Sequence, residues 1–383
     1  MTSARSLLLT TSMAVLSAWT LVACGPNIPD TIKIGVAQPL SGSSAARGQD
    51  LLNGVKLAAA ELNASGYKIA GKPVQIEIVA MDDKADKEEA KKVAQALVDQ
   101  KVTAVIGHLS SDVTEAVIPV YKRGNVPQLF TSSAAELTKL GEGNTFRLVA
   151  NDVLQARAIA SYLAETLNAG KVAILHEDTA FGTPMAKDVT AALAKLKKKV
   201  ELSQPVSNKI TDFADFVGKL KAAPPDALVA AVRDHQLLPL FAQMNAAGLS
   251  NVPVIVTSVA KTQKLVNGPA DVKSVFLTSS SLDPSEFMAG GEFLNKFRAA
   301  YKSEPVWAAH YAYDGMYVLA DVMRRAESVE ASALRAQLVT IDAIAPATNT
   351  MRFNAEGEQR FGAISVYQKR NSRWEPLMRS DRW

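Results

Sequence analysis

The sequence predicts an α/β protein built from two open units, each with a parallel central sheet. Short apolar runs rich in β-branched residues alternate with segments of helical periodicity, which is typical of parallel sheets covered by helices on both faces. The alternation restarts near position 150, and a chain of 383 residues is long enough for two domains. Two neighbouring predicted strands also end in hydroxyl-rich turns, and open parallel sheets bind ligands at such strand ends.

In the first unit, predicted strands and helices alternate up to position 130. The predicted strands span 31–38, 74–80, 102–106 and 126–130. The predicted helices span 49–62, 88–99 and 110–122, and a loop at 39–48 precedes the first of them. Gly107 and Gly124 mark the ends of elements, because glycine is unfavourable inside both strands and helices.

The second unit repeats this plan after Arg147. Its predicted strands span 171–176, 200–205, 227–232, 252–256 and 272–278, and its predicted helices span 182–196, 213–221 and 235–247. Helices at 287–301 and 306–325 and a hairpin at 364–368 and 374–378 follow. Because the first unit has too few elements to be complete, we expect the chain to cross back. The predicted N-terminal lobe is 31–149 plus 279–349, and the predicted C-terminal lobe is 150–278 plus 350–383.

The first residues have the pattern of a secretory signal rather than of the folded domain. A positive start containing Arg5 precedes a mostly apolar stretch, and the sequence LVAC then ends at Cys24. This ending resembles the lipobox of bacterial lipoproteins, so residues 1–23 are predicted to be a lipoprotein signal peptide and 24–30 a tether. Lipidation of Cys24 would anchor the chain to a bacterial membrane. The alternatives are ordinary cleavage near Ala23 and an uncleaved membrane anchor.

Composition and motifs argue against several classes of function. The formal net charge is +4 from 42 basic and 38 acidic residues with no long basic run, so a nucleic-acid partner is not expected. The four histidines lack metal-ligand spacing and the single cysteine lies in the signal region, so we expect no metal and no cofactor. No G-x-S-x-G elbow or phosphate-binding P-loop is present, and the chain is predicted not to be an enzyme.

Hydroxyl-bearing residues mark the candidate ligand site. Ser110, Ser111 and Asp112 follow the predicted strand 102–106 and open a helix. Thr131, Ser132 and Ser133 follow the next predicted strand. Free N–H groups at helix N-termini attract anions such as a carboxylate. Ordinary helix capping is the alternative explanation for each turn taken alone.

Two acidic residues and one histidine offer weaker alternatives. Asp82 and Asp83 end a predicted strand and suggest a cation site, although adjacent acids more often belong to the turn before a helix. His108 lies beside the candidate serines, which suggests a base and a nucleophile. A histidine at a strand end is more often a structural residue.

The chain resembles the substrate-binding proteins of branched-chain amino acid ABC transporters, the type I periplasmic binding proteins of the leucine/isoleucine/valine group. The resemblance spans about 31–370, and VIGHLSS with the downstream SSAAELT is its most specific part. The other matching stretches are IKIGVAQPLSG, NGVKLAAAELNASG, MDDKADKEEA and HYAYDG. The resemblance implies two Rossmann-like lobes joined by a hinge of three crossovers, with the ligand in the cleft between them.

The resemblance also implies which residues hold the ligand. In the family, the two loops that match these positions hold the carboxylate and amine of an amino acid, and they correspond to Leu109, Ser110, Ser111, Ser132 and Ser133. Phe181 matches an aromatic position of the second lobe.

Three features depart from the family pattern. Arg47 stands where an aromatic residue is common, and a further aromatic position falls near Arg233 or Asp234. The acid expected near Ser258 to neutralise the ligand amine is missing.

The resemblance implies an extracytoplasmic solute-binding component of an ABC importer, with permease subunits as partners. A component of this kind would bind an amino acid or related small carboxylate, in the periplasm or at the cell-envelope surface. The alternative is a receptor module that signals its bound state to a membrane partner. The arginines predict a more polar ligand than leucine, with Asp234 available to meet an amine. Pairing of Arg47 with Asp234 as a latch, or exposure of Arg47 to solvent, are the other possibilities.

Overall fold

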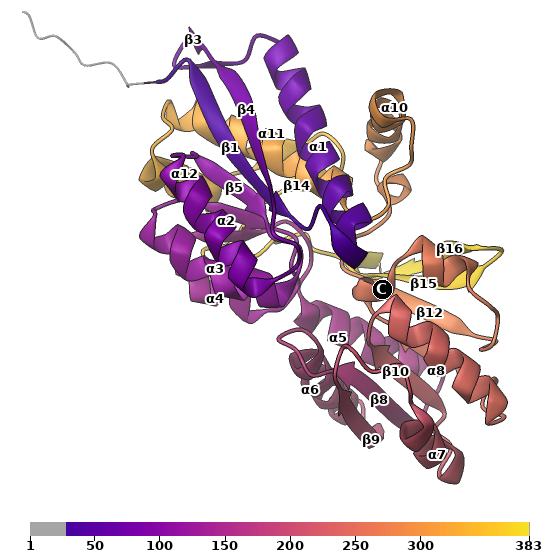
Figure 1. The fold of residues 1–383 in the computed structure, drawn as a ribbon. Helices are drawn as coiled ribbons and strands as arrows, with labels where there is room; N and C mark the ends of the chain where they lie inside the picture. Colours follow the sequence, from indigo (N-terminus) through magenta and orange to yellow (C-terminus); the bar gives the residue numbers. More distant parts are fainter. Residues whose placement is uncertain (1–27, 383) are drawn as a thin grey trace, which may run out of the picture.

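The computed structural model describes residues 28–382, and Figure 1 shows them as two α/β lobes, one above the other. The sheet of the first lobe has the strand order β4-β1-β5-β6-β7, and all its neighbouring strands are parallel. Its strands are β1 (Thr31–Gln38), β4 (Gln75–Asp82), β5 (Ala104–Gly107), β6 (Gln128–Phe130) and β7 (Thr145–Arg147). The predicted strand 31–38 coincides with β1.

The sheet of the second lobe has the strand order β16-β15-β12-β11-β10-β8-β9. Its strands are β8 (Lys171–Glu177), β9 (Lys199–Val206), β10 (Ala227–Ala231), β11 (Val254–Val256), β12 (Val275–Ser279), β15 (Ser365–Arg370) and β16 (Arg373–Arg379). The last two strands run antiparallel, so this sheet is mixed rather than purely parallel. The short turn between them is sufficient only for an antiparallel hairpin, because a parallel connection needs a crossover.

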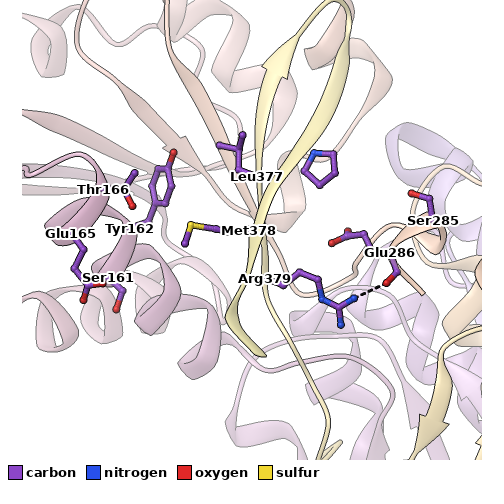
Figure 2. A pocket seen from close by; sticks show the side chains of 10 residues that line it. Ser161, Tyr162, Glu165, Thr166, Ser285, Glu286, Leu377, Met378 and Arg379 are labelled. Carbon is purple, nitrogen blue, oxygen red and sulfur yellow. Dashed lines mark hydrogen bonds between the residues drawn. The ribbon is translucent and has the colours of Figure 1, made fainter. Parts of the chain in front are cut away.

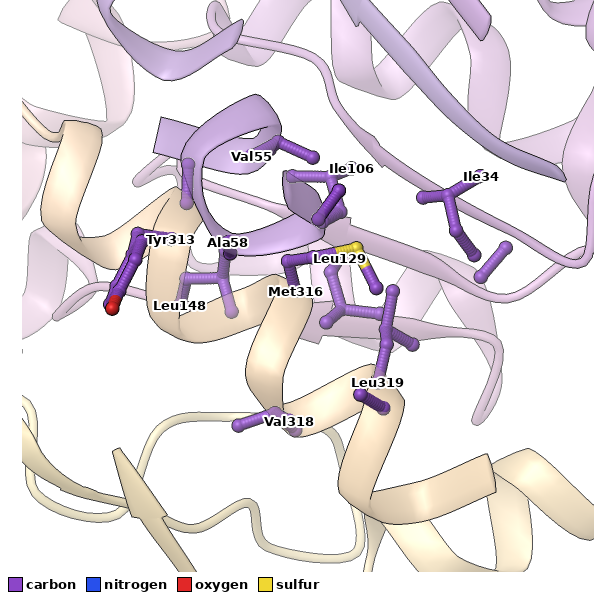
Figure 3. Packing of buried hydrophobic residues seen from close by; sticks show 14 of the residues in the cluster. Ile34, Val55, Ala58, Ile106, Leu129, Leu148, Tyr313, Met316, Val318 and Leu319 are labelled. Atoms are coloured by element: carbon purple, nitrogen blue, oxygen red, sulfur yellow. The ribbon is translucent and has the colours of Figure 1, made fainter. Parts of the chain in front are cut away.

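Helices cover both faces of the first sheet. Helices α1 (Ala45–Ala64) and α11 (Ala309–Ala326) cover one face, and α2 (Lys87–Asp99) and α3 (Ser111–Arg123) the other. Figure 3 shows the first of these layers, where Ile34, Ile106 and Leu129 of the strands share one hydrophobic cluster with Met316 of α11. The remaining elements of this lobe are α4 (Glu136–Gly141), α10 (Gly290–Tyr301), α12 (Ala331–Leu338) and the ribbons β2 (Lys68–Ile69), β3 (Lys72–Pro73), β13 (Ala343–Ala345) and β14 (Asn349–Met351).

The second sheet is covered in the same way. Helix α5 (Asp152–Ser161), its π-helical continuation (Tyr162–Thr166) and α6 (Gly182–Lys195) cover one face. Helices α7 (Ala214–Ala222), α8 (Asp234–Ala246) and α9 (Gln263–Asn267) cover the other. No helix within 28–382 combines the length and the apolar character needed to cross a membrane.

The chain passes between the lobes at three places: after β7, after β12, and between β14 and β15. In Figure 1 the orange helix α11 therefore lies among the indigo elements of the first lobe. Ser279 still belongs to β12, whereas Met351 and Phe353 pack in the first core. The predicted boundaries at 278/279 and 349/350 are therefore displaced by a few residues, because these strands continue through them.

Strand order determines where a ligand fits. In the first sheet β1 lies between β4 and β5, and in the second sheet β8 lies between β9 and β10. The connections that leave β1 and β5, and those that leave β8 and β10, therefore diverge to opposite sides of their sheets. Open α/β sheets hold ligands in the crevice created at this point, outside the carboxyl ends of the strands.

Candidate functional site

The carboxyl ends of both sheets face one another across a cavity of about 50 Å³. The residues that line it follow strand ends of both lobes, except Trp307, which precedes α11. The lining residues are Pro39, Ser44, Arg47, Ala85, Leu109, Ser110, Ser111, Asp112, Thr131, Ser133, Phe181, Arg233, Ser258, Val259, Ser280 and Trp307. This volume is sufficient for only a few water molecules, so the cavity in this arrangement of the lobes is too small for a larger solute.

A larger groove of about 800 Å³ lies away from these strand ends, between the π-helical segment and β16 (Figure 2). Two of its charged groups, Arg379 and Glu286, already have partners in the protein. Arg379 donates to the main-chain oxygen of Glu286 and to Asp381, and the Glu286 carboxylate accepts from Tyr367. The interlobe cavity is therefore the better candidate for a ligand site.

The cavity brings together most of the residues expected from the sequence. They are Arg47, Leu109, Ser110, Ser111, Ser133, Phe181 and Arg233. The side chains of Ser132 and Asp234 do not line it. The Ser132 hydroxyl is buried, lies in hydrogen-bond contact with the Thr114 hydroxyl and donates to the His108 carbonyl. Asp234 accepts from the Thr262 hydroxyl at 3.0 Å.

Two adjoining loops of the first lobe supply the hydroxyl groups. The Ser111 Oγ accepts a hydrogen bond from the Ala134 N–H at 3.3 Å, which joins the loop after β5 to the loop after β6. Ser110 is the N-cap of α3, yet its side chain makes no cap hydrogen bond. The buried Thr131 hydroxyl has no partner among residues 28–382. The N-terminus of a thirteen-residue helix and free hydroxyls thus meet at one wall, which suits an anion.

Two arginines from opposite lobes form the other charged part of the cavity. Arg47 lies in the first turn of α1, because this helix begins at Ala45 rather than at the predicted position 49. Its Nη1 donates across the cavity to the Val259 carbonyl at 3.3 Å, and its guanidinium lies 6.0 Å from the Trp307 ring centroid. Burial, with a smaller contribution from nearby Arg233, lowers the pKa of Arg47 to about 10, so it remains charged at neutral pH.

Arg233 is held by an acid of its own lobe. Its Nε donates to both oxygens of the buried Glu177, at 3.1 and 3.3 Å. Burial raises the pKa of Glu177, and the charge of Arg233 opposes that shift. Asp234 pairs with neither arginine within 4 Å, so the possible Arg47–Asp234 latch is not formed.

Asp112 is the one carboxylate among the lining residues. Its Oδ1 accepts from the Ala180 N–H of the second lobe at 2.9 Å and lies 3.8 Å from the Lys87 ammonium. The Asp112–Ala180 and Arg47–Val259 contacts both cross the cavity, so the lobes touch in a closed arrangement. The Ser258 hydroxyl, near which an acid was expected, instead donates to Gln155 at 3.0 Å.

The alternative chemistry of this region finds no support in the geometry. His108 contacts Asp83 at 2.6 Å and the Tyr121 hydroxyl at 3.0 Å through its two ring nitrogens, so neither nitrogen engages the candidate serines. Asp82 accepts from the Leu40 and Lys84 N–H groups. Across the described part of the chain, no group of three or more His, Cys, Asp or Glu residues is arranged to hold a metal ion.

Several lining residues were not among the ligand contacts predicted from the sequence. Thr131 and Asp112 were recognised as members of the two hydroxyl-rich turns, although the predicted contacts in these turns were their neighbours. Trp307, Val259 and Ser280 carry no such signal, because they reach the cavity only through packing between distant segments.

Two α/β lobes whose strand ends enclose a polar cavity define a two-lobed binding protein. Residues 31–372 match the family model described as periplasmic binding protein, which is more than half of the chain. The chain belongs to the periplasmic binding protein family.

Individual relatives agree with this assignment. The "Amino acid binding protein" of Pseudomonas aeruginosa is 31% identical over 76% of this chain and 77% of its own length. The "Leu/Ile/Val-binding protein homolog 2" of Brucella abortus is 29% identical over 91% of this chain and 93% of its own. A branched-chain amino acid transporter substrate binding protein of Streptococcus pneumoniae, solved with isoleucine, covers 91% of this chain and 99% of its own at 26% identity, with a TM-score of 0.78.

Proposed function

We propose that this protein captures a small carboxylate-bearing solute, an amino acid or a close relative, outside the cytoplasm for an ABC permease. The observation that carries the proposal is the convergence of strand ends from both lobes on one cavity with a helix N-terminus and free hydroxyls. Such a wall suits a carboxylate. The relatives described above, which include an amino acid binding protein and a branched-chain amino acid transporter substrate binding protein, agree with it.

In this proposal no bond is made or broken. Ligand bound to residues of both lobes stabilises the closed arrangement, because some of its contacts exist only when the lobes meet. The involvement of His108 with Asp83 and Tyr121 supports a binding rather than a catalytic role.

We expect Ser111→Ala to weaken ligand binding by roughly tenfold to a hundredfold. A hydrogen bond to a charged group in a closed cavity contributes about 1.5–3 kcal/mol, and each 1.4 kcal/mol corresponds to about tenfold in affinity. A thermal-shift screen of amino acids, dicarboxylates, amides and aromatic acids identifies the ligand, because a molecule that binds only the folded state raises the melting temperature. Titration calorimetry with that ligand then compares the variant with wild type.

Ser303→Ala is the matched control, because Ser303 is exposed in the first lobe and does not line the cavity. The control should bind as wild type does. Because Ser111 also joins two loops, the melting temperature of the ligand-free variant is measured to separate lost binding from lost folding. Unchanged affinity of a folded Ser111→Ala protein would remove this residue from the site, and a screen without any binder would contradict the proposed function.

We propose that a lipid on Cys24 anchors the protein to the membrane. Cys24 lies outside the residues that the structure describes. The sequence LVAC supports cleavage before this cysteine and acylation of its thiol. We expect mass spectrometry of the mature chain to find a lipidated cysteine at the N-terminus. We also expect Cys24→Ala to release the protein from membranes. An unmodified N-terminus elsewhere, or membrane retention of the variant, would contradict the anchor.

A further inference from the structure

Arg47 has more hydrogen-bond donors than the protein uses. A guanidinium carries five N–H donors. Within residues 28–382, its recorded hydrogen bond is the one from Nη1 to Val259, and no carboxylate lies within 4 Å of its nitrogens. Its side chain is partly buried and lines the cavity. The remaining donors are therefore available to a molecule in the cavity.

Arg233 offers a second set of donors from the opposite lobe. Its Nε is paired with Glu177, whereas its terminal nitrogens have no recorded partner in the described structure. The terminal N–H groups of a guanidinium form a planar fork that matches both oxygens of a carboxylate. The ion pair with Glu177 fixes the side chain, so this fork is held in place before the ligand arrives.

An apolar ligand side chain would leave these donors without partners. When the cavity closes over leucine, Arg47 loses water and gains no carboxylate in direct contact, because Asp234 and Glu177 act on its charge only from beyond 4 Å. A buried charge without a directly bonded partner is costly. The hydroxyl wall around Ser111 and Ser133 already accounts for one ligand carboxylate. A second anionic group would pair with Arg47 and with the terminal donors of Arg233 that Glu177 leaves free.

We propose that the ligand carries a second carboxylate, bound between Arg47 of the first lobe and Arg233 of the second. This inference rests on the proposed function and narrows it to acidic ligands with two carboxylates. Contact with both lobes makes the second carboxylate a determinant of closure as well as of specificity.

Two classes of ligand carry two carboxylates: an acidic amino acid, and a dicarboxylate without an amine. Asp112 distinguishes them, because its carboxylate lines the cavity and would pair with a ligand amine. Its Oδ1 is engaged by Ala180, and no hydrogen bond of its Oδ2 is recorded within the described residues. An Asp112→Asn variant removes this charge from the cavity.

The test is titration calorimetry of the full-length protein with L-glutamate, L-glutamine, L-aspartate, L-leucine and glutarate. We expect the acids to bind wild type at least about tenfold tighter than glutamine and leucine, because a charge-assisted bidentate pair is stronger than a neutral hydrogen bond. Arg47→Gln and Arg233→Gln should reduce this acid-over-amide ratio to near one. The exposed Arg298→Gln, on α10, is the control and should leave the ratio unchanged.

Each outcome decides the proposal. Tight binding of glutamate that weakens in Asp112→Asn supports an acidic amino acid, and equal or tighter binding of glutarate supports a dicarboxylate. The proposal of a second carboxylate would be overturned if leucine or glutamine bound as tightly as the acids and both arginine variants showed the same acid-over-amide ratio as wild type. That result would leave the proposed function intact. A wild-type protein that binds no small solute would overturn both.

Discussion

Replacing Arg147 with methionine should lower the free energy of unfolding by about 3–5 kcal/mol, the usual cost of removing one member of a buried ion pair. Arg147 has no exposed surface, and its Nη2 lies 3.0 Å from the Glu358 carboxylate. Its guanidinium also donates to the main-chain carbonyls of Ser132 and Ala134. One side chain therefore supplies the counter-charge of Glu358 and ties it to the loop after β6. Glu358 also accepts from Thr138 and Asn151, so it keeps hydrogen bonds in the variant but loses its cation.

This arginine also connects the hinge to the ligand cavity. It ends β7, immediately before the first passage between the lobes, and Glu358 lies on the third passage. Ser132 and Ala134 flank Ser133, which lines the cavity. We therefore expect the variant to bind ligand more weakly as well as to unfold more easily, because the loop after β6 loses its support.

Urea unfolding followed by circular dichroism measures the effect, and Arg298→Met provides an exposed arginine control with an expected change near zero. The double variant Arg147→Met, Glu358→Gln should recover part of the loss, since it removes the unpaired charge. An Arg147→Met protein as stable as wild type would show that the ion pair is not a major source of stability.

The fold was predictable because its signals are local. The apolar runs of β1, β8 and β10 are bounded by polar turns, and the predicted ranges agree with these strands to within one residue. The hydroxyl-rich turns after β5 and β6 were equally visible, since capping residues follow strands directly. Placement of these turns at one wall of a cavity then follows from the parallel order of the sheet.

Side-chain direction inside the turns was not predictable in the same way. Ser132 and Ser133 are neighbours in the sequence, yet one hydroxyl bonds Thr114 inside the lobe and the other residue lines the cavity. Successive residues of extended backbone point to opposite sides, so the sequence alone does not say which serine faces the ligand. Arg233 and Asp234 are also neighbours that differ in position. Arg233 lines the cavity, whereas Asp234 is the first residue of α8 and accepts a hydrogen bond from Thr262.

Contacts between distant segments account for the rest of the cavity. Trp307 reaches it because Asp50, on α1, accepts hydrogen bonds from the main chain that precedes α11, at a separation of more than 250 residues. The sequence shows an acid on a helix and a tryptophan near another helix, and no local pattern links them. The energy of such a contact depends on tertiary packing rather than on either segment alone.

That acid is the second large determinant of stability, and Asp50→Ala should lower the free energy of unfolding by about 2–4 kcal/mol. The buried Asp50 carboxylate accepts from the N–H groups of Val306, Trp307, Ala308 and Ala309, at 2.7, 3.0, 2.9 and 2.9 Å. Three of these donors belong to the segment that leads into α11 and the fourth to its first residue, where N–H groups have no partner within the helix. Alanine would leave them buried and unsatisfied.

The same substitution should weaken ligand binding, because Trp307 lines the cavity and contacts Arg47. Asp50→Asn keeps one acceptor oxygen and is expected to lose less stability than Asp50→Ala, whereas the exposed Asp99→Ala should lose little. Urea unfolding gives the stability of all three, and calorimetry gives their affinities. If Asp50→Ala unfolds at the same urea concentration as wild type, other contacts stabilise the main chain at 306–309. If the variant unfolds at lower urea but binds ligand with wild-type affinity, Trp307 is positioned by its own packing and not by Asp50.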